Sequence, residues 1–282
     1  MRRVEAYVER APRPELAGIV RTVWIQRTGA TAYAQRHLPT GGVEIHWPLG
    51  GRPTLLGPLT EPQLELVPAH TTIVGVRFRP GAAPLASIAL DALVDQRGDL
   101  ADLWGGDVDR LGETAAAGAG LAAAPALALL QARVLHEVRT SGTGDPLVHA
   151  AVDALMPWHP MDVRTVAAHL ALSASQLRRR CLHTLGLGPK AVQRTLRFQG
   201  FLALAQAGET ASGRRGADGM AGLAIDVGYA DQAHLSRECV RLTGVTPTQL
   251  LGGDVDRCRC GHDHAASYRP FLASRRRVPR IA

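Results

Sequence analysis

Hydrophobic positions in the C-terminal half recur with the spacing of two short helices that share one pattern. Leu177 and Cys181 lie four residues apart, and so do Leu235 and Cys239, which places each pair on one buried helix face. The polar residues around them are predicted to face outward. These residues are Ser175, Gln176, Arg178 and Arg179 in the first helix, and Gln232, His234, Ser236 and Arg237 in the second.

The two helices belong to an internal repeat with an offset of 58 residues. Ser173 and Asp231 are expected to be the N-caps, because a short side-chain oxygen accepts a free backbone N–H of the first turn. Glycine is expected at both helix ends and proline at the start of the helix that follows. The repeated positions are Leu177, Arg179, Cys181, Gly186 and Pro189, and then Leu235, Arg237, Cys239, Gly244 and Pro247.

Each repeat also has a short apolar segment in front, at 164–170 and 222–227, which is expected to form a supporting helix. The second turn, which starts at Gly228, is one residue longer than the first, and glycine there is free to adopt positive φ. A helix, a tight turn and a second helix form a helix-turn-helix, and two units predict contact with two major-groove windows. The alternative is a helical bundle whose exposed arginines form an ordinary solvated surface.

A linker helix from Pro189 to Gln206 would be roughly 27 Å long, comparable with the ~34 Å between successive major-groove windows. Arg194 and Arg197 on it are predicted to contact phosphates. Residues 150–282 carry a net charge of +8 and residues 1–149 a net charge of −1. A basic half beside a neutral half is typical of a nucleic-acid-binding module attached to another domain.

The N-terminal half shows short runs of β-branched and apolar residues separated by turns, followed by segments rich in alanine and leucine. The expected strands are 19–27, 42–47, 63–67 and 71–78, and the expected helices lie within 99–104 and 115–139. The predicted fold class is α+β, with a small antiparallel β-barrel or sheet plus helices before an all-α module. The predicted domains are 1–105, a helical connector 106–145, the DNA-binding module 146–251 and a basic tail 252–282.

Residues 146–251 resemble the DNA-binding module of the AraC/XylS family of bacterial transcription regulators, above all in Gly228-Tyr-Ala-Asp-Gln-Ala-His-Leu-Ser-Arg and Thr243-Gly-Val-Thr-Pro. The resemblance implies two helix-turn-helix units joined by a long helix, with double-stranded DNA and RNA polymerase as partners. Two departures are visible. Cysteine stands at 181 and 239 in place of the usual phenylalanine, which would loosen each core, and a glycine-rich insert at 207–219 would make the linker more mobile.

Residues 4–105 resemble the cupin-like sensor domain of the same family through the segments 38–46, 56–58 and 74–81. This resemblance implies a domain that binds a small-molecule effector or a partner subunit, including a second copy of the chain as a homodimer. The side chains expected to face the barrel interior are Glu44, His46, Arg77 and Arg79. Strand alternation alone would equally allow them to lie outside.

A third feature is the cluster Cys258, Cys260, His262 and His264, whose side chains suit zinc or another thiophilic metal. In an extended strand these positions are too far apart for one ion, so the chain would have to loop at Gly261. A flexible basic tail is the alternative. A metal-linked alkylation-repair protein is the alternative function, and a purely architectural DNA binder is a third.

No other catalytic motif is visible, so the chain is not expected to be an enzyme. The absence of a long apolar run or a signal peptide, together with four cysteines, predicts a cytoplasmic protein with no membrane contact. The sequence therefore predicts a one-component transcription regulator that is controlled at its N-terminal domain.

Overall fold

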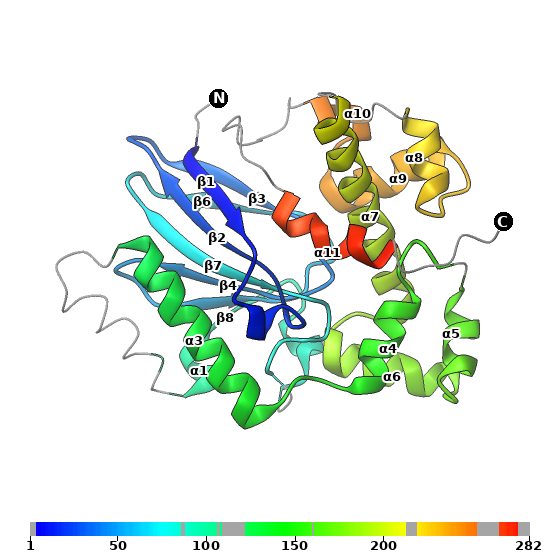
Figure 1. The fold of residues 1–282 in the computed structure, drawn as a ribbon, viewed down its shortest axis with the longest axis horizontal. Helices are drawn as coiled ribbons and strands as arrows, with labels where there is room; N and C mark the ends of the chain where they lie inside the picture. Colours follow the sequence, from blue (N-terminus) through cyan, green and yellow to red (C-terminus); the bar gives the residue numbers. More distant parts are fainter. Residues whose placement is uncertain are drawn as a thin grey trace.

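The computed structural model describes residues 4–85, 88–105, 108, 122–159, 161–212, 219–252 and 265–275. Figure 1 shows an antiparallel sheet in the N-terminal half and helices throughout the C-terminal half, which confirms the predicted α+β class. No helix in the described ranges is both long and apolar enough to span a membrane.

The N-terminal half contains a six-stranded and a two-stranded antiparallel sheet. All four expected strands are present, and four further ones are short or polar. The larger sheet has the order β1 (Val4–Arg10), β2 (Val20–Thr28), β7 (Thr72–Phe78), β4 (Glu44–Pro48), β5 (Thr54–Leu56) and β8 (Arg97–Asp99). The smaller sheet pairs β3 (Tyr33–His37) with β6 (Gln63–Val67).

One face of the larger sheet is apolar and is covered by α3 (Ala123–Ser141), which packs on β7 and β2 (Figure 1). Alternate residues of β2 and β7, such as Val23 and Val76, form one core with Leu130 of α3. The helix expected to be a connector is thus a layer of the N-terminal domain. The short α1 (Leu100–Trp104) begins at Asp99, whose side chain accepts a hydrogen bond from Ala101 N.

The opposite face of this sheet carries buried polar side chains beside a small apolar cluster around Trp24. Cross-strand pairing aligns Glu9, Trp24, Gly75 and His46 on four neighbouring strands. It also places Arg77 of β7 directly opposite Glu44 of β4. Gly75 is required here, because a Cβ at this position would lie 2.1 Å from the Trp24 ring. The indole thus fills space that any other residue at 75 would occupy, and its edge meets the His46 ring at 5.0 Å between centroids.

Two helical lobes lie along α7, the long helix of the C-terminal half (Figure 1). The first lobe buries Leu177 and Cys181 and the second buries Leu235 and Cys239, as the sequence predicts. The helices are α4 (Pro146–Ala154), α5 (Val163–His169), α6 (Ala174–Leu185), α7 (Pro189–Ser212), α8 (Met220–Asp226), α9 (Gln232–Thr243) and α10 (Pro247–Gly252). Because α7 continues to Ser212, residues 207–212 of the glycine-rich insert are helical. The mobility expected of this insert stays a prediction, and residues 213–218 lie outside the described ranges.

A last helix, α11 (Ala265–Arg275), lies between α7 and the N-terminal sheet and packs on α7, β1 and β2 (Figure 1). Its Phe271 is 3% exposed, and the Arg21 guanidinium of β2 lies 4.7 Å from the centre of that ring. Arg21 Nε also donates a hydrogen bond of 2.6 Å to Ser267 O. The tail alternative is therefore wrong for residues 265–275, which connect the two halves of the molecule.

Candidate DNA interface and buried polar cluster

The two recognition helices, α6 and α9, are capped as the sequence predicts. Gln176 N donates to Ser173 Oγ at 3.2 Å while Ser173 N donates to Gln176 Oε1 at 2.8 Å, which forms a capping box. In the second unit His234 N donates to Asp231 Oδ1 at 2.6 Å. Both helices end at a glycine in the left-handed conformation, Gly186 and Gly244. These contacts fix where each recognition helix starts and stops.

The turns that lead into the recognition helices differ in the way the sequence predicts. Gly228 has φ +82° in the second turn, and Ala171 occupies the corresponding place in the first turn with φ +53°. A residue with a Cβ is strained at positive φ, whereas glycine is not. The first turn therefore stores backbone strain that the second avoids.

We expect Ala171→Gly to stabilise the chain by ~0.5 to 1 kcal/mol, because relief of the left-handed strain exceeds the added freedom of glycine in the unfolded chain. Gly228→Ala should destabilise it by about 1 kcal/mol through backbone strain. A Cβ at 228 would meet Arg197 Nε at 3.5 Å, which is an ordinary contact. Thermal unfolding of both variants checks this pair, and a shift of the same sign for both would contradict the argument.

The predicted DNA-reading residues of α6 are all exposed, namely Ser175, Gln176, Arg178 and Arg179. In α9, Gln232 and Arg237 are exposed, whereas His234 and Ser236 are half-buried. The His234 ring lies 5.1 Å from the Tyr229 ring, and Ser236 Oγ donates to Gln232 O at 2.9 Å. Arg237 and Gln232 thus stand out as the accessible base-reading candidates of α9.

The linker-helix arginines lie close to the second unit. Arg194 Nε forms an ion pair of 3.4 Å with Glu238 Oε2 of α9, and Arg197 lies beside Gly228 in the turn before α9. Both side chains are half-buried. These contacts orient α9 against α7, and the phosphate contacts of Arg194 and Arg197 stay a prediction.

The two helix-core cysteines are buried in the cores of their units, since Cys181 is 1% and Cys239 0% exposed. Burial raises the pKa of Cys181 to about 12 and that of Cys239 to about 11. Both thiols are therefore protonated at neutral pH and serve as apolar packing groups rather than nucleophiles.

The first recognition helix also contacts the N-terminal domain through η2 (Leu90–Leu93). A Cβ on Gly186 would lie 2.7 Å from Leu90 O, so the end of α6 and η2 meet closely. Beside this contact is a cavity of about 500 Å³ between the two halves. Apolar Leu85 and Ile88 line one side of it and Arg179, Arg180 and His183 of α6 the other.

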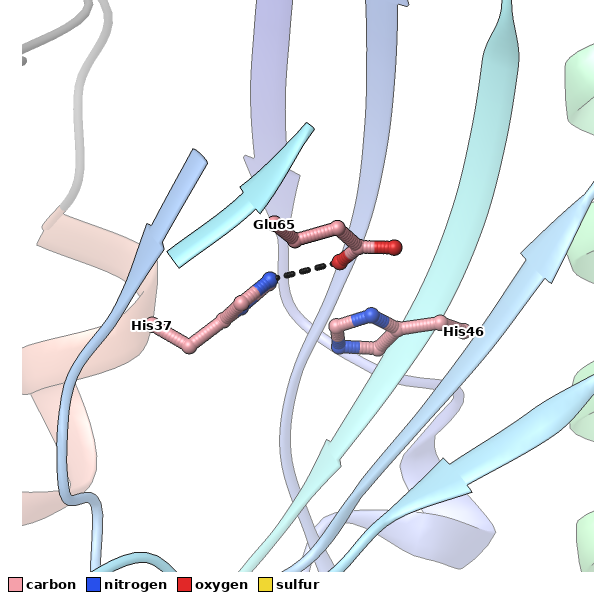
Figure 2. A group of neighbouring side chains, drawn as sticks. All are labelled: His37, His46 and Glu65. Atoms are coloured by element: carbon pink, nitrogen blue, oxygen red, sulfur yellow. Dashed lines mark hydrogen bonds and ion pairs between the residues drawn. The ribbon is translucent and has the colours of Figure 1, made fainter. Parts of the chain in front are cut away.

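On the polar face of the N-terminal sheet, His37 of β3, His46 of β4 and Glu65 of β6 point toward one another (Figure 2). His37 Nε2 and Glu65 Oε2 are 2.8 Å apart, and one ligand atom from each of the three residues lies within 4.8 Å of the others. Burial lowers the pKa of His46, which holds its ring neutral.

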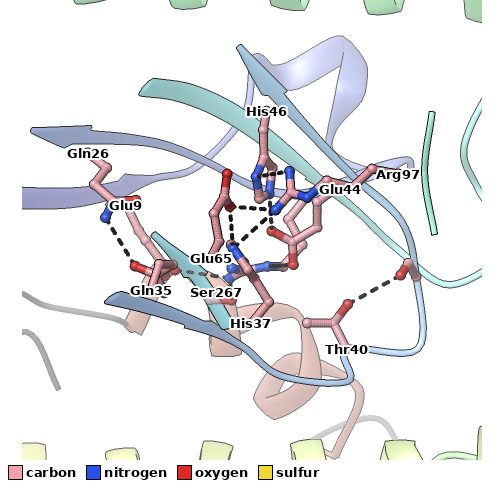
Figure 3. Close-up of polar contacts among 12 residues, drawn as sticks. Glu9, Gln26, Gln35, His37, Thr40, Glu44, His46, Glu65, Arg97 and Ser267 are labelled. Atoms are coloured by element: carbon pink, nitrogen blue, oxygen red, sulfur yellow. Dashed lines mark hydrogen bonds and ion pairs between the residues drawn. The ribbon is translucent and has the colours of Figure 1, made fainter. Parts of the chain in front are cut away.

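Arg97 of β8 reaches into this group, as Figure 3 shows. Its NH2 lies 2.5 Å from Glu65 Oε2 and 3.3 Å from His37 Nε2, and its NH1 lies 3.5 Å from His46 Nδ1. Burial alone would raise the pKa of Glu65, but His37 and Arg97 outweigh it and bring that pKa to about 2. Glu65 is therefore ionised near neutral pH.

Glu44 and Arg77, two of the predicted effector residues, pair with each other beside this group. Arg77 Nε donates to Glu44 Oε1 at 2.6 Å, and Arg77 NH1 donates to Glu9 Oε1 and to Ser267 Oγ of α11, both at 3.0 Å. Burial would raise the pKa of Glu44, but Arg77 and His46, through their charges and hydrogen bonds, together outweigh it and hold that pKa well below its usual range.

Glu44 and His46 are buried and Arg77 is half-buried on this face of the larger sheet, while Arg79 lies half-buried just past the end of β7; the effector-binding role of these four residues stays a prediction. Sequence reasoning missed His37, Glu65 and Arg97. The polar alternation of β3 and β6 was the available signal, but the pairing that brings them to His46 was not visible in it. The Cys258, Cys260, His262 and His264 cluster lies outside the described residues, and nothing in the described part favours the alkylation-repair alternative.

The sequence matches two family models. Residues 8–99 match one described as a domain of unknown function (DUF6597), and residues 166–252 match one described as a helix-turn-helix domain. The second match runs from α5 to α10 and so includes both units. No curated protein matches the sequence.

Among solved structures, an apo ToxT variant from Vibrio cholerae strain SCE256 is 12% identical, with 86% of this chain and 99% of that chain covered and a TM-score of 0.46. Wild-type ToxT from the same strain with a bound unsaturated fatty acid is 12% identical, with coverages of 89% and 96% and a TM-score of 0.43.

Proposed function

We propose that this chain, a DNA-binding transcription regulator with an AraC-type double helix-turn-helix module, reads two adjacent major-groove windows with α6 and α9. The observation that supports this proposal is a pair of capped helices on one long helix, each with exposed polar side chains at its N-terminal turns. The N-terminal residues of a recognition helix are the ones that contact base edges.

The length of α7 suits this reading. Its 24 residues correspond to about 36 Å at 1.5 Å per residue, close to the ~34 Å between successive major-groove windows on one face of DNA. Arg179 in α6 and Arg237 in α9 each offer a planar fork that matches the two acceptors of guanine. We assign base reading to these two arginines, with Gln176 and Gln232 as neighbouring readers.

The N-terminal domain is proposed to control this reading in response to a small-molecule effector or a partner. It contacts the DNA module through η2 against α6, through Gln199 of α7, which donates a hydrogen bond of 2.8 Å to Pro39 O, and through Arg36 of β3, which donates one of 3.1 Å to Thr243 O of α9; α11 packs on both α7 and the N-terminal sheet. A change in this domain would therefore reach the supports of both recognition helices. RNA polymerase and a second copy of the chain are the further partners that we propose on the family resemblance.

The proposal is tested by selection of DNA fragments from a genomic pool with the purified full chain. We expect a small set of fragments bound ~10³-fold or more tightly than random DNA, with an affinity that falls steeply with salt as phosphate counterions are released. Failure to bind any fragment at low salt would overturn the regulator proposal.

A further inference from the structure

We propose that His37, His46 and Glu65 form a binding site for a divalent first-row transition metal such as Zn²⁺, and that the Arg97 guanidinium holds the cation position when no metal is bound. The site lies inside the N-terminal domain and uses none of the exposed polar side chains of α6 and α9. It is independent of the proposed DNA reading.

The three side chains offer donor atoms that suit a transition metal. Two imidazoles and one carboxylate are ligands that zinc and its neighbours accept, with metal–ligand distances of ~2.0 to 2.2 Å. Ligand atoms around one such ion are then roughly 3.3 Å apart. In the structure they lie within 4.8 Å of one another, so small side-chain rotations complete the arrangement.

The neighbours of His46 hold its ring in an orientation that suits a metal ligand. Its Nε2 lies 3.6 Å from Glu44 Oε2, while its Nδ1 is directed at Arg97 NH1. A metal-binding histidine commonly directs its other ring nitrogen at a carboxylate, which fixes the tautomer and the ring orientation. The ring is also held edge-on against Trp24, with the two ring centroids 5.0 Å apart. Glu44 is thus a positioning residue for His46.

Arg97 shows that the site already attracts a cation. One guanidinium contacts all three proposed ligands, at 2.5, 3.3 and 3.5 Å. Arg97 sits in β8, a three-residue strand at the edge of the sheet, and its side chain is 30% exposed. It can therefore turn toward solvent without moving a buried strand, whereas the three ligands stay on paired strands. Metal and Arg97 are competitors for one position.

The experiment titrates Co²⁺ and, separately, Zn²⁺ into the untagged full chain in which Cys258 and Cys260 are changed to Ser and His262 and His264 to Asn. This background removes the predicted C-terminal cluster. We expect one Co²⁺ per chain, seen as visible absorption and confirmed by calorimetry. Arg97→Gln should tighten binding by ~10-fold or more, because the internal competitor is gone.

In the Arg97→Gln chain, His37→Asn and Glu65→Gln should each weaken metal binding by more than the ~10 to 100-fold that loss of an outer-sphere partner causes. His169→Asn, at a residue in α5 outside this cluster, is the matched control and should change nothing. Thermal unfolding gives an independent reading: Zn²⁺ should raise the Tm of the Arg97→Gln chain and leave that of its His37→Asn derivative unchanged.

Substoichiometric binding in both the parent and the Arg97→Gln chain would overturn the site. So would stoichiometric binding that survives His37→Asn and Glu65→Gln, since the metal would then lie elsewhere. The same metal-free chains are also tested in the selection of DNA fragments. Loss of metal binding with DNA binding retained would contradict only the metal site, and loss of DNA binding with metal binding retained would contradict only the DNA reading.

Discussion

Replacing Arg179 and Arg237 together with alanine is expected to weaken binding to the selected DNA site by about 2 to 6 kcal/mol, since each bidentate arginine–guanine contact is worth ~1 to 3 kcal/mol. The two residues lie on different helices, α6 and α9, so the two losses should add. Competition binding at one fixed salt concentration measures the change, and each single variant should relax the preference at its own base pair.

Arg139→Ala is the matched control, because Arg139 is exposed on α3 in the N-terminal domain. It should leave the affinity within about twofold of the parent chain. Equal losses on selected and random DNA would make Arg179 and Arg237 phosphate contacts and would contradict their role as base readers.

Arg77→Met is expected to lower the free energy of unfolding by ~3 to 5 kcal/mol, because it removes a guanidinium that pairs with two buried carboxylates. The side chains of Glu9 and Glu44 are only 2% and 8% exposed, and both bond to Arg77. Urea unfolding followed by tryptophan fluorescence measures the change, since Trp24 and Trp47 lie in the same sheet.

Two comparisons make this result specific. Glu44→Gln added to Arg77→Met should recover part of the loss by removing one of the two buried charges that Arg77 neutralised. Arg52→Met should cost under ~1 kcal/mol, because Arg52 pairs with Asp99 at 2.9 Å while its side chain is 66% exposed. A loss at Arg77 no larger than that at Arg52 would show that the buried pairs do not stabilise the domain.

The helix-turn-helix units could be predicted from the sequence because their determinants are local. The cap at Ser173, the left-handed glycine at Gly186 and the proline at 189 lie within 17 residues of one another, and a second copy repeats them. Even the difference between the two turns was visible, since one residue more stands between Gly228 and the cap at Asp231. Interactions within a few residues need no knowledge of the rest of the fold.

The polar cluster could be predicted only in part because its members meet through strand pairing. His37 and Glu65 face each other only because β3 pairs with β6, and Arg97 reaches both from 60 and 32 residues away. A shift of one residue in register would turn any of these side chains to the other face. Alternation identified interior candidates on β4 and β7, but it could not identify their partners.

The helix α11 was missed for a related reason. Pro270 interrupts its sequence, and its stability comes from packing rather than from helix propensity. Phe271 and Ser267 are buried only because α7 and the N-terminal sheet meet at this place. Such burial depends on how the two halves pack against each other, and no local sequence pattern indicates that.

Hydroxyl-radical footprinting of the full chain on its selected site shows whether one chain reads two adjacent major-groove windows. We predict two protected windows on one face of the DNA, about 10 base pairs apart. Arg179→Ala should weaken one window and Arg237→Ala the other. A single window, or two windows that both variants leave unchanged, would contradict the account.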